Sequence, residues 1–365
     1  MKKKVLVVDD SAFMRKLISD FLSDSDQLEV VGIARNGEDA IRKVKKLCPD
    51  VVTLDVEMPI MNGIDALKKI MQECPVPVVM LSSTTMEGAE ETVTAMQLGA
   101  VDFIAKPSGT ISLDLHKIQS EIVQKVLSAS SVNISKLTTL AHTEVKNNQP
   151  QASLNGMQKN NRFPSSPKTS WRKDLPNVIL IGTSTGGPRA LQQVLTKFPK
   201  NLDAPVVVVQ HMPPGFTKSL ADRLNGLSGI LVKEAEQGEI LQKGTAYIAP
   251  GGFHTKIVEI GKNLAIQLTK EEAPRNGHRP SVDVLFESIS EVNHYNKIAV
   301  IMTGMGSDGS KGLVKLKELG VVKAIAESKE TCIVFGMPKS AIATNLVDNV
   351  EDIENIAQSI MKYML

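Results

Sequence analysis

Short runs of β-branched and aliphatic residues alternate with amphipathic stretches of helical period through the first 126 residues of the chain. Strand-like runs lie at 4–9, 28–34, 51–55, 78–82 and 101–105, and helical stretches lie at 13–22, 38–47, 64–71, 88–98 and 111–127. Strands that are each followed by a helix pair in parallel, and the helices cover the sheet. The sequence therefore predicts an N-terminal (βα)5 domain of the α/β class.

A second α/β pattern begins near residue 176. Its strand-like runs lie at 178–181, 205–210, 245–248, 264–268 and 298–302, and its helical stretches lie at 189–198, 217–226, 282–291 and 311–318. The four valines at 206–209 are typical of a central parallel strand that is buried on both faces. We expect a C-terminal doubly wound, mostly parallel α/β domain, since 365 residues are enough for two domains.

The two patterns are separated by a segment rich in Ser, Asn, Gln, Thr and Pro. Residues 128–174 contain seven Lys or Arg residues and two acidic ones, and their few apolar residues have no regular period. Such a composition does not bury enough apolar surface to fold by itself. We predict a first domain at 1–126, a polar flexible linker at 127–174 and a second domain at 175–365.

Composition excludes several classes of protein. The net charge of +2 gives no reason to expect nucleic-acid binding. No apolar stretch approaches the ~20 residues of a membrane span, and the apolar run after the N-terminal lysines is too short for a signal peptide. The three cysteines lack metal-binding spacing, as is typical of free thiols in a reducing compartment. We expect a cytoplasmic protein that is not inserted in a membrane.

Five chemically related side chains lie where the predicted strands of the first domain end. Asp9 and Asp10 end the first strand, Asp55 ends the third and Ser82 the fourth, and Lys106 follows the fifth. Because the carboxyl ends of parallel strands meet at one edge of a sheet, these side chains should lie together. Three converging carboxylates repel one another and call for a hard cation, most naturally Mg²⁺.

These residues provide the parts of an acyl-phosphate site. Asp55 can accept a phosphoryl group as the nucleophile, Lys106 can neutralise its charge, and the Ser82 hydroxyl can donate to a phosphoryl oxygen. A single aspartate at a strand end is often only the N-cap of the next helix. Five suitable residues in order on successive strand ends favour the phosphorylation site.

The same segments resemble the response-regulator receiver domain of the CheY kind. The matching segments are Val-Val-Asp-Asp-Ser at 7–11, Leu-Asp-Val-Glu-Met-Pro at 54–59, Met-Leu-Ser-Ser at 80–83 and Ala-Lys-Pro at 105–107. The resemblance implies that Asp55 is the phosphoacceptor and that Asp9 and Asp10 bind Mg²⁺ together with it. It also implies that Ser82 is the switch hydroxyl and that Lys106 is the charge partner.

In the second domain a glycine-rich segment lies between a strand and a helix. Residues 182–187 read Gly-Thr-Ser-Thr-Gly-Gly, and Pro188 opens the helix that follows. A phosphate-binding loop would need G-x-G-x-x-G or a Gly-Lys-Ser/Thr ending, and neither is present. A nucleophile elbow needs G-x-S-x-G, which the residues around Ser184 satisfy, although so short a pattern often arises by chance.

A serine nucleophile needs a base. His211 directly follows a predicted strand and should lie at the same sheet edge as Ser184. His254 and His278 lie in loop-like segments and remain alternatives, whereas His294 lies in a polar stretch typical of the surface. Position favours His211 without excluding the other two.

The base in turn needs an acid that orients it. Asp308 follows the predicted strand 298–302 and should lie at the same edge, unless it is only a turn residue in its glycine-rich loop. The resulting order along the chain is Ser–His–Asp. Since α/β-hydrolases have the order Ser–Asp–His, we do not assign the domain to that superfamily.

Six segments of the second domain resemble the CheB family of chemotaxis protein-glutamate methylesterases. They are Ile-Gly-Thr-Ser-Thr-Gly-Gly at 181–187, Gln-His-Met-Pro-Pro-Gly-Phe-Thr at 210–217, Ile-Ala-Pro-Gly-Gly-Phe-His-Thr at 248–255, His-Arg-Pro-Ser-Val-Asp at 278–283, Thr-Gly-Met-Gly-Ser-Asp-Gly at 303–309 and Val-Phe-Gly-Met-Pro at 334–338. Both domains resemble this family in the same order, apart from the linker.

The resemblance implies a catalytic triad. Ser184 would be the nucleophile, His211 its base and Asp308 the acid that orients the base. Backbone N–H groups near Thr185 and Met305 would form the oxyanion hole. The residues left over, His254, His278 and Asp283, would be structural or would line a substrate groove.

The implied function is phosphorylation-activated hydrolysis of glutamate methyl esters, and deamidation of glutamines, on the cytoplasmic helices of methyl-accepting chemoreceptors. The chemotaxis histidine kinase CheA would phosphorylate Asp55, and the unphosphorylated receiver would cover the catalytic cleft. Mg²⁺ would be needed at the phosphorylation site only, with no cofactor for the esterase chemistry. The alternative is a receiver-controlled nucleotide-binding module without catalysis. The second domain lacks the helix-turn-helix pattern and basic face of a transcription factor.

Overall fold

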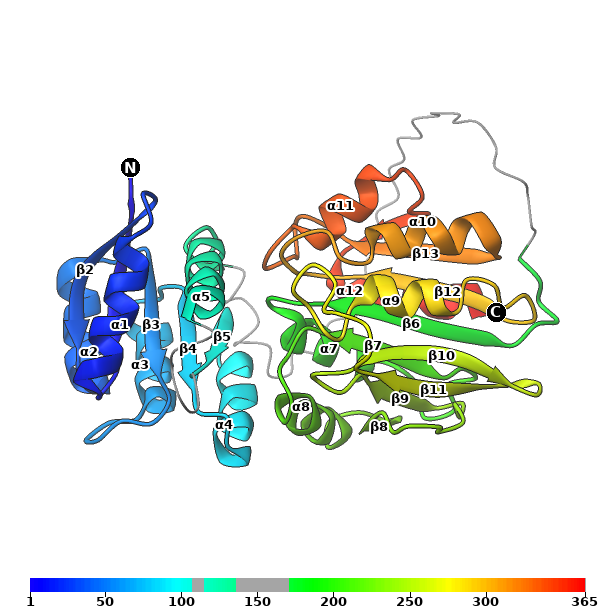
Figure 1. Ribbon diagram of the computed structural model, residues 1–365, viewed down its shortest axis with the longest axis horizontal. Coiled ribbons are helices and arrows are strands. Elements are labelled where there is room, and N and C mark those ends of the chain that lie inside the picture. Colours follow the sequence, from blue (N-terminus) through cyan, green and yellow to red (C-terminus); the bar gives the residue numbers. More distant parts are fainter. Residues whose placement is uncertain (107–114, 136–170, 365) are drawn as a thin grey trace, which may run out of the picture.

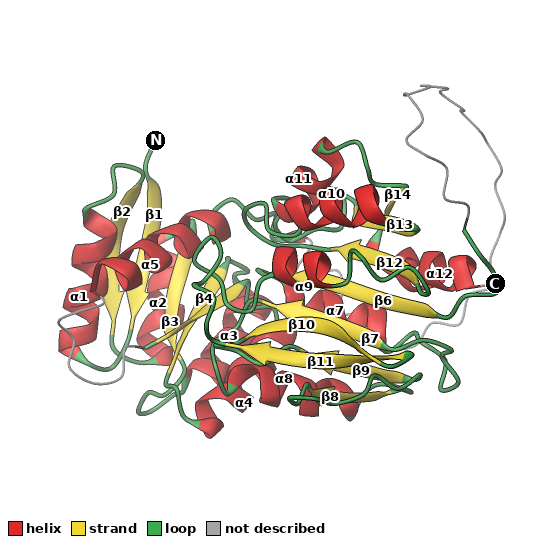
Figure 2. Ribbon diagram, turned by 45° about the vertical axis from the view of Figure 1, so that its right-hand side comes forward, coloured by secondary structure: helices red, strands yellow, loops and turns green. Residues whose placement is uncertain are grey.

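The structure, a computed structural model, describes residues 1–106, 115–135 and 171–364 of the chain (Figure 1). It consists of two α/β domains, each built on a sheet that is covered by helices, as Figure 2 shows by colour. None of the helices in these ranges is long and apolar enough to cross a membrane.

The N-terminal domain is a five-stranded parallel sheet in the order β2-β1-β3-β4-β5. Its elements are β1 (Lys3–Val8), α1 (Ala12–Ser23), β2 (Leu28–Ala34), α2 (Gly37–Leu47), β3 (Val51–Asp55), α3 (Gly63–Glu73), β4 (Val78–Ser82), α4 (Met86–Gln97), β5 (Asp102–Ala105) and α5 (Leu115–Ala129). The predicted (βα)5 fold is confirmed. Residues 111–114 of the helix predicted at 111–127 lie outside the described residues.

Alternate residues of each strand in this domain face opposite helical layers. Leu6 and Val8 of β1 pack in the cluster that contains α2, α3 and α4, whereas Val5 and Val7 pack with α1 and α5. The strands are therefore apolar on both faces, as parallel strands usually are. The side chains of the predicted site lie at or just beyond the carboxyl ends of these strands.

The C-terminal domain is a seven-stranded parallel sheet in the order β14-β13-β12-β6-β7-β9-β8, with an antiparallel hairpin β10–β11 beside it. Its elements are β6 (Asn177–Thr183), α7 (Gly187–Leu195), β7 (Val206–Gln210), α8 (Phe216–Asn225), β8 (Leu231–Glu234), β9 (Thr245–Ile248), β10 (His254–Ile260), β11 (Asn263–Thr269), α9 (Val282–Ser288), β12 (Asn296–Ile301), α10 (Ser310–Leu319), β13 (Val322–Glu327), α11 (Met337–Ala343), β14 (Asn349–Glu351) and α12 (Ile353–Met364). The predicted doubly wound, mostly parallel domain is confirmed.

Both faces of the large sheet are covered. Ile179 and Ile181 of β6 pack in the cluster with α7, α8 and α12, while Val178 and Leu180 pack with α9, α10 and the hairpin. The prediction that His254 lies in a loop is wrong, because this residue begins β10 and pairs with Thr269 of β11.

The two domains pack through α4 of the first against α7 and α8 of the second. The rings of Phe103 and Phe216 stack with centroids 4.7 Å apart, and Arg223 Nη2 donates to Gln97 Oε1 at 2.9 Å. One cluster of buried apolar residues continues from the first domain into the second. Residues 136–170 of the predicted linker lie outside the described residues, so the proposed boundaries stay predictions.

Candidate functional site

The three predicted metal-binding carboxylates lie together. Oxygen atoms of Asp9, Asp10 and Asp55 are all within 4.8 Å of one another, and Asp9 and Asp55 are buried. Asp9 and Asp10 follow β1, and Asp55 ends β3. The order of the sheet reverses at these neighbouring strands, where doubly wound folds bind ligands. Three negatively charged oxygen ligands form a donor set that suits Mg²⁺.

Lys106 joins this cluster. Its Nζ lies 2.7 Å from Asp55 Oδ2 and 3.0 Å from Asp9 Oδ2. Burial would lower the pKa of Lys106, but the ion pairs with Asp55 and Asp9 raise it above its usual value. Burial raises the pKa of Asp55 to about 6, and the charge of Asp9 adds to this effect while Lys106 opposes it.

Ser82 lies at the same edge but is engaged elsewhere. Its hydroxyl donates to the carbonyl of Gly88 in α4 at 2.9 Å and is fully buried. No hydrogen bond joins it to the aspartates among the described residues. The structure thus brings Asp9, Asp10, Asp55 and Lys106 into contact and places Ser82 beside them, bonded to α4.

Ser184 and His211 lie next to each other at the end of two paired strands. Thr183, the last residue of β6, is in register with Gln210, the last residue of β7. Each catalytic candidate is the residue that follows, and the amide of His211 donates to the Thr183 carbonyl at 3.2 Å. Gly186 continues the turn after Ser184 with φ +77°, a conformation that favours glycine.

His211 forms a close pair with Asp308. The distance from His211 Nε2 to Asp308 Oδ2 is 2.8 Å, and both side chains are almost completely buried. The other ring nitrogen, His211 Nδ1, is buried and has no hydrogen-bond partner among the described residues. Nδ1 is therefore the nitrogen available to take a proton.

Asp308 is held by a set of hydrogen-bond donors at the start of α9 and α10. Its carboxylate accepts from Ser281 Oγ at 2.9 Å and from the amides of Val282 at 2.7 Å, Asp283 at 3.0 Å and Gly309 at 3.1 Å. Burial would raise the pKa of Asp308, but the hydrogen bond and charge of His211 and the donated amides hold it well below its usual range. Asp308 therefore stays ionised and fixes the His211 ring.

Gln210 joins the backbones of the candidate nucleophile Ser184 and the candidate base His211. Its Nε2 donates to the carbonyls of Ser184 at 3.0 Å and His211 at 3.2 Å, and its Oε1 accepts from Thr183 Oγ1 at 2.6 Å. The side chain is buried, and a Cβ at Gly187 would lie 1.8 Å from Gln210 Oε1. Neither Gln210 nor Ser281 was predicted as a site residue, although each stands in a segment that resembles the CheB family.

The two predicted oxyanion donors are the backbone amides of Thr185 and Met305. Thr185 follows Ser184 directly, and neither the amide of Thr185 nor that of Met305 donates a hydrogen bond within the described parts of the chain. Gly304 packs so closely that a Cβ there would lie 2.8 Å from Ser184 Cβ. The carbonyl of Gly304 accepts from the amides of Gly336 at 3.1 Å and Met337 at 2.8 Å, which fixes this loop.

The remaining candidates have other surroundings. His254 is buried and bonded through Nε2 to the Ala273 carbonyl at 3.1 Å, and the half-exposed His294 lies 3.2 Å from Glu259. Asp283 accepts from the Gly312 amide at 2.7 Å. These contacts tie elements together and leave His211 as the histidine that is bonded to Asp308.

His278 differs from these residues because it reaches the site. Its ring stacks on that of His211 with centroids 3.9 Å apart. The prediction that it lies in a loop agrees with its place between β11 and α9.

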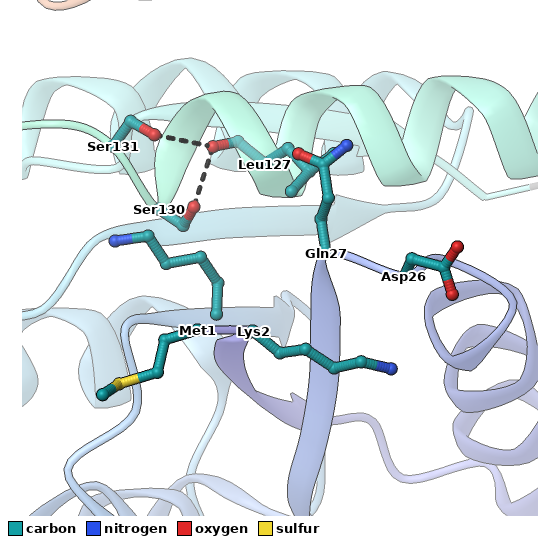
Figure 3. Close-up of a pocket in the computed structure, with 8 residues that line it drawn as sticks. Met1, Lys2, Asp26, Gln27, Leu127, Ser130 and Ser131 are labelled. Atoms are coloured by element: carbon teal, nitrogen blue, oxygen red, sulfur yellow. Dashed lines mark hydrogen bonds between the residues drawn. The ribbon is translucent and has the colours of Figure 1, made fainter.

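A pocket of about 600 Å³ lies away from both sites (Figure 3). It is lined by the N-terminus, Asp26, Gln27 and the end of α5, where Ser130 and Ser131 donate to the Leu127 carbonyl. None of the predicted site residues lines it.

Both domains match known protein families. Residues 179–360 match the family model described as CheB methylesterase, and residues 5–118 match the response regulator receiver domain. A protein of Geobacillus kaustophilus is 56% identical over 366 residues, which covers 98% of this chain and 98% of its own. The chain belongs to the CheB methylesterase family.

That relative and one from Halalkalibacterium halodurans, 56% identical over 98% of this chain and 97% of its own, are both named protein-glutamate methylesterase/protein-glutamine glutaminase. The solved catalytic domain of the Thermotoga maritima CheB methylesterase is 46% identical and covers 51% of this chain and 97% of its own, with a TM-score of 0.49. The names of the two relatives support the hydrolase interpretation and not the nucleotide-binding alternative. The receiver match implies in general terms that Mg²⁺ binds at a phosphorylation site.

Proposed function

We propose that the second domain hydrolyses glutamate methyl esters and deamidates glutamines on the cytoplasmic helices of methyl-accepting chemoreceptors, under the control of the receiver domain. The observation that carries the proposal is the His211–Asp308 pair, 2.8 Å apart, with Nδ1 of His211 left unpaired within the described residues. Ser184 and His211 each follow one of two paired strands. The names of the relatives supply the substrate class.

The His211–Asp308 contact supports a separate role for each ring nitrogen of His211. Nε2 carries the proton that it donates to Asp308, so Nδ1 is free to remove the proton from Ser184 Oγ. Oγ attacks the ester carbonyl, and the ionised Asp308 stabilises the imidazolium that forms. The ring is thus used in the reverse orientation to the common triad, in which Nδ1 faces the acid.

The developing oxyanion would accept from the amides of Thr185 and Met305, which donate to no acceptor in the described ranges. Loss of one such donor typically costs ~10²–10³ in rate. His211 returns its proton to the leaving methoxide, so methanol departs and leaves an acyl-enzyme on Ser184. Water then attacks with the help of Nδ1 and restores the glutamate. With a glutamine substrate the leaving group is ammonia, and the same residues act.

In the receiver domain, Asp55 would be the phosphoacceptor, with Asp9 and Asp10 completing the ligands for Mg²⁺. When bound, Mg²⁺ neutralises negative charge on the transferred phosphoryl group. Lys106, already paired with Asp55, would remain as a charge partner of the phosphoryl oxygens. The Ser82 hydroxyl would exchange the Gly88 carbonyl for a phosphoryl oxygen and so signal the change to α4.

Control of the hydrolase follows from where the domains pack. The receiver contacts α7 and α8, which begin next to the segments of Ser184 and His211. A receptor helix and the receiver would compete for this side of the catalytic domain. Phosphorylation would shift the population towards states in which the domains separate. The phosphodonor would be the chemotaxis histidine kinase CheA, and the reaction would take place in the cytoplasm.

A serine-reactive organophosphorus probe tests the chemistry. Ser184 should be labelled in the wild-type chain, and Ser184→Ala should abolish both labelling and methanol release from methylated receptor while leaving phosphorylation of Asp55 intact. Ser131→Ala, which changes an exposed serine just after α5, serves as the control. Methanol release by the Ser184→Ala variant at the wild-type rate would reject the nucleophile.

A further inference from the structure

His278 contacts His211 through the stacking of their two rings. The rings of His278 and His211 are 3.9 Å apart at their centroids and only 9° from parallel. No hydrogen bond joins His278 to Ser184 or Asp308 within the described residues, so His278 lacks the orienting acid that His211 has.

The His278 ring is held by its own turn. The backbones of Arg275 and His278 exchange two hydrogen bonds of 3.0 Å, with Asn276 and Gly277 between them at positive φ. Arg275 Nη1 donates to Glu287 Oε2 of α9 at 2.6 Å, which anchors the turn to the helix that also donates to Asp308. The stacked ring is thus placed by the same element as the orienting acid.

The stack supplies a constraint that the acid cannot. The hydrogen bond from Nε2 to Asp308 fixes one point of the His211 ring but leaves the ring free to tilt about that point. A flat neighbour against its face restricts the tilt, and stacked aromatic rings attract each other beyond their buried area. The tilt decides whether Nδ1 meets the Ser184 proton, and errors of about 1 Å in such geometry can cost ~10²-fold in rate.

We propose that His278 is a positioning residue for the hydrolase, whose imidazole ring stacks on His211 and holds Nδ1 in line with Ser184. This inference rests on the proposed hydrolase. It predicts that ring shape matters at position 278 and that proton transfer by His278 does not. The charge state supports this role, because burial lowers the pKa of His278 to about 4, with the charge of His211 adding to the effect.

The test compares His278→Phe, which keeps a flat ring, with His278→Gln, which keeps polarity but loses the ring. Methanol release from methylated receptor gives kcat and KM for each full-length chain. His278→Gln should lower kcat ~10- to 100-fold with KM changed less than about twofold, and His278→Phe should keep kcat within about threefold of wild type. His294→Gln, on a half-exposed histidine, is the control and should match wild type.

Two outcomes would overturn the proposal. Wild-type kcat in His278→Gln would show that the stack does not position His211, and equal losses in His278→Phe and His278→Gln would show that the imidazole itself is required. Thermal unfolding of each variant shows whether a loss of activity comes from a folding defect. Such a defect would lower the stability of His278→Phe as well as that of His278→Gln. Activity of the Ser184→Ala chain would instead reject the proposed hydrolase, so the two failures are distinguishable.

Discussion

The hydroxyl of Thr185 donates a hydrogen bond to the carboxylate of Asp102 across the domain interface, with 2.5 Å between Thr185 Oγ1 and Asp102 Oδ2. Thr185 follows the nucleophile, and Asp102 begins β5 of the receiver. Both residues are buried. Asp102 also lies 3.5 Å from Lys125 of α5. The segment that contains Ser184 is thereby joined directly to β5 of the receiver domain, and through Asp102 to α5.

Thr185→Val should raise the activity of the unphosphorylated chain. A hydrogen bond to a charged group contributes ~1.5–3 kcal/mol, so its loss should shift the closed population roughly tenfold or more towards open states. Activity of the phosphorylated chain should change little. Gln97→Ala removes an exposed contact to Arg223 and is the matched control, with a much smaller effect. Unchanged basal methanol release in Thr185→Val would show that this bond does not restrain the enzyme.

Gln210→Leu should weaken both catalysis and stability. The substitution keeps the approximate volume but leaves the carbonyls of Ser184 and His211 and the Thr183 hydroxyl without their partner, at a cost of about 1–3 kcal/mol. We expect kcat to fall by at least ~10-fold. Chemical denaturation and methanol release measure the two effects. Gln358→Leu, on the exposed face of α12, should change neither, and full activity in Gln210→Leu would remove Gln210 from the catalytic framework.

His278→Phe should reduce the acid sensitivity of the fold. Burial lowers the pKa of His278 from 6.5 to about 4; His211 and Lys125 add to this effect, and Asp308 and Glu121 oppose it. Between pH 6.5 and 4 the unfolded chain binds a proton that the folded chain does not, so stability falls as the pH falls. The Phe variant lacks this loss, which is of the order of 3 kcal/mol at full extent. Urea unfolding at pH 7 and pH 4.5 measures the difference, and parallel profiles would contradict it.

Lys297→Met should stabilise the catalytic domain near neutral pH. Lys297 is fully buried in β12, and its Nζ donates to the Ser290 carbonyl at 3.1 Å. Burial lowers its pKa from 10.5 to about 8, opposed by Glu259. Wild-type stability should therefore rise between pH 8 and 10.5, because the unfolded chain holds the extra proton there. The Met variant should lack this rise, whereas Lys262→Met, on an exposed turn, should keep it.

The sequence predicted most of the strands that are apolar on both faces and followed by a helix, but it missed β13 and the helices α11 and α12. It missed β10 because alternating polar and apolar residues replace the apolar run there, although Gly261 and Lys262 form the two-residue turn that signals a hairpin. The short strands β8 and β14 at the edges of the sheet carry little apolar signal.

The part of the candidate site that lies at strand ends was predictable, because the carboxyl ends of parallel strands meet at one edge of a sheet. Asp55 and its neighbours are adjacent for that reason. The contacts of Gln210, Ser281 and Asp102 could not be predicted, since each bonds to a residue that is distant in the chain and becomes its neighbour only in the folded protein. His278 was considered as a base, but only the folded chain shows that its ring meets His211 face to face.

The central claim is that phosphorylation of Asp55 controls a hydrolase built on Ser184. Methanol release from methylated receptor, measured with and without a small phosphodonor in the presence of Mg²⁺, tests it most directly. The wild-type chain should be stimulated, Asp55→Asn should keep basal release without stimulation, and Ser184→Ala should release none. Stimulation of the Asp55→Asn chain, or release by the Ser184→Ala chain, would contradict the account.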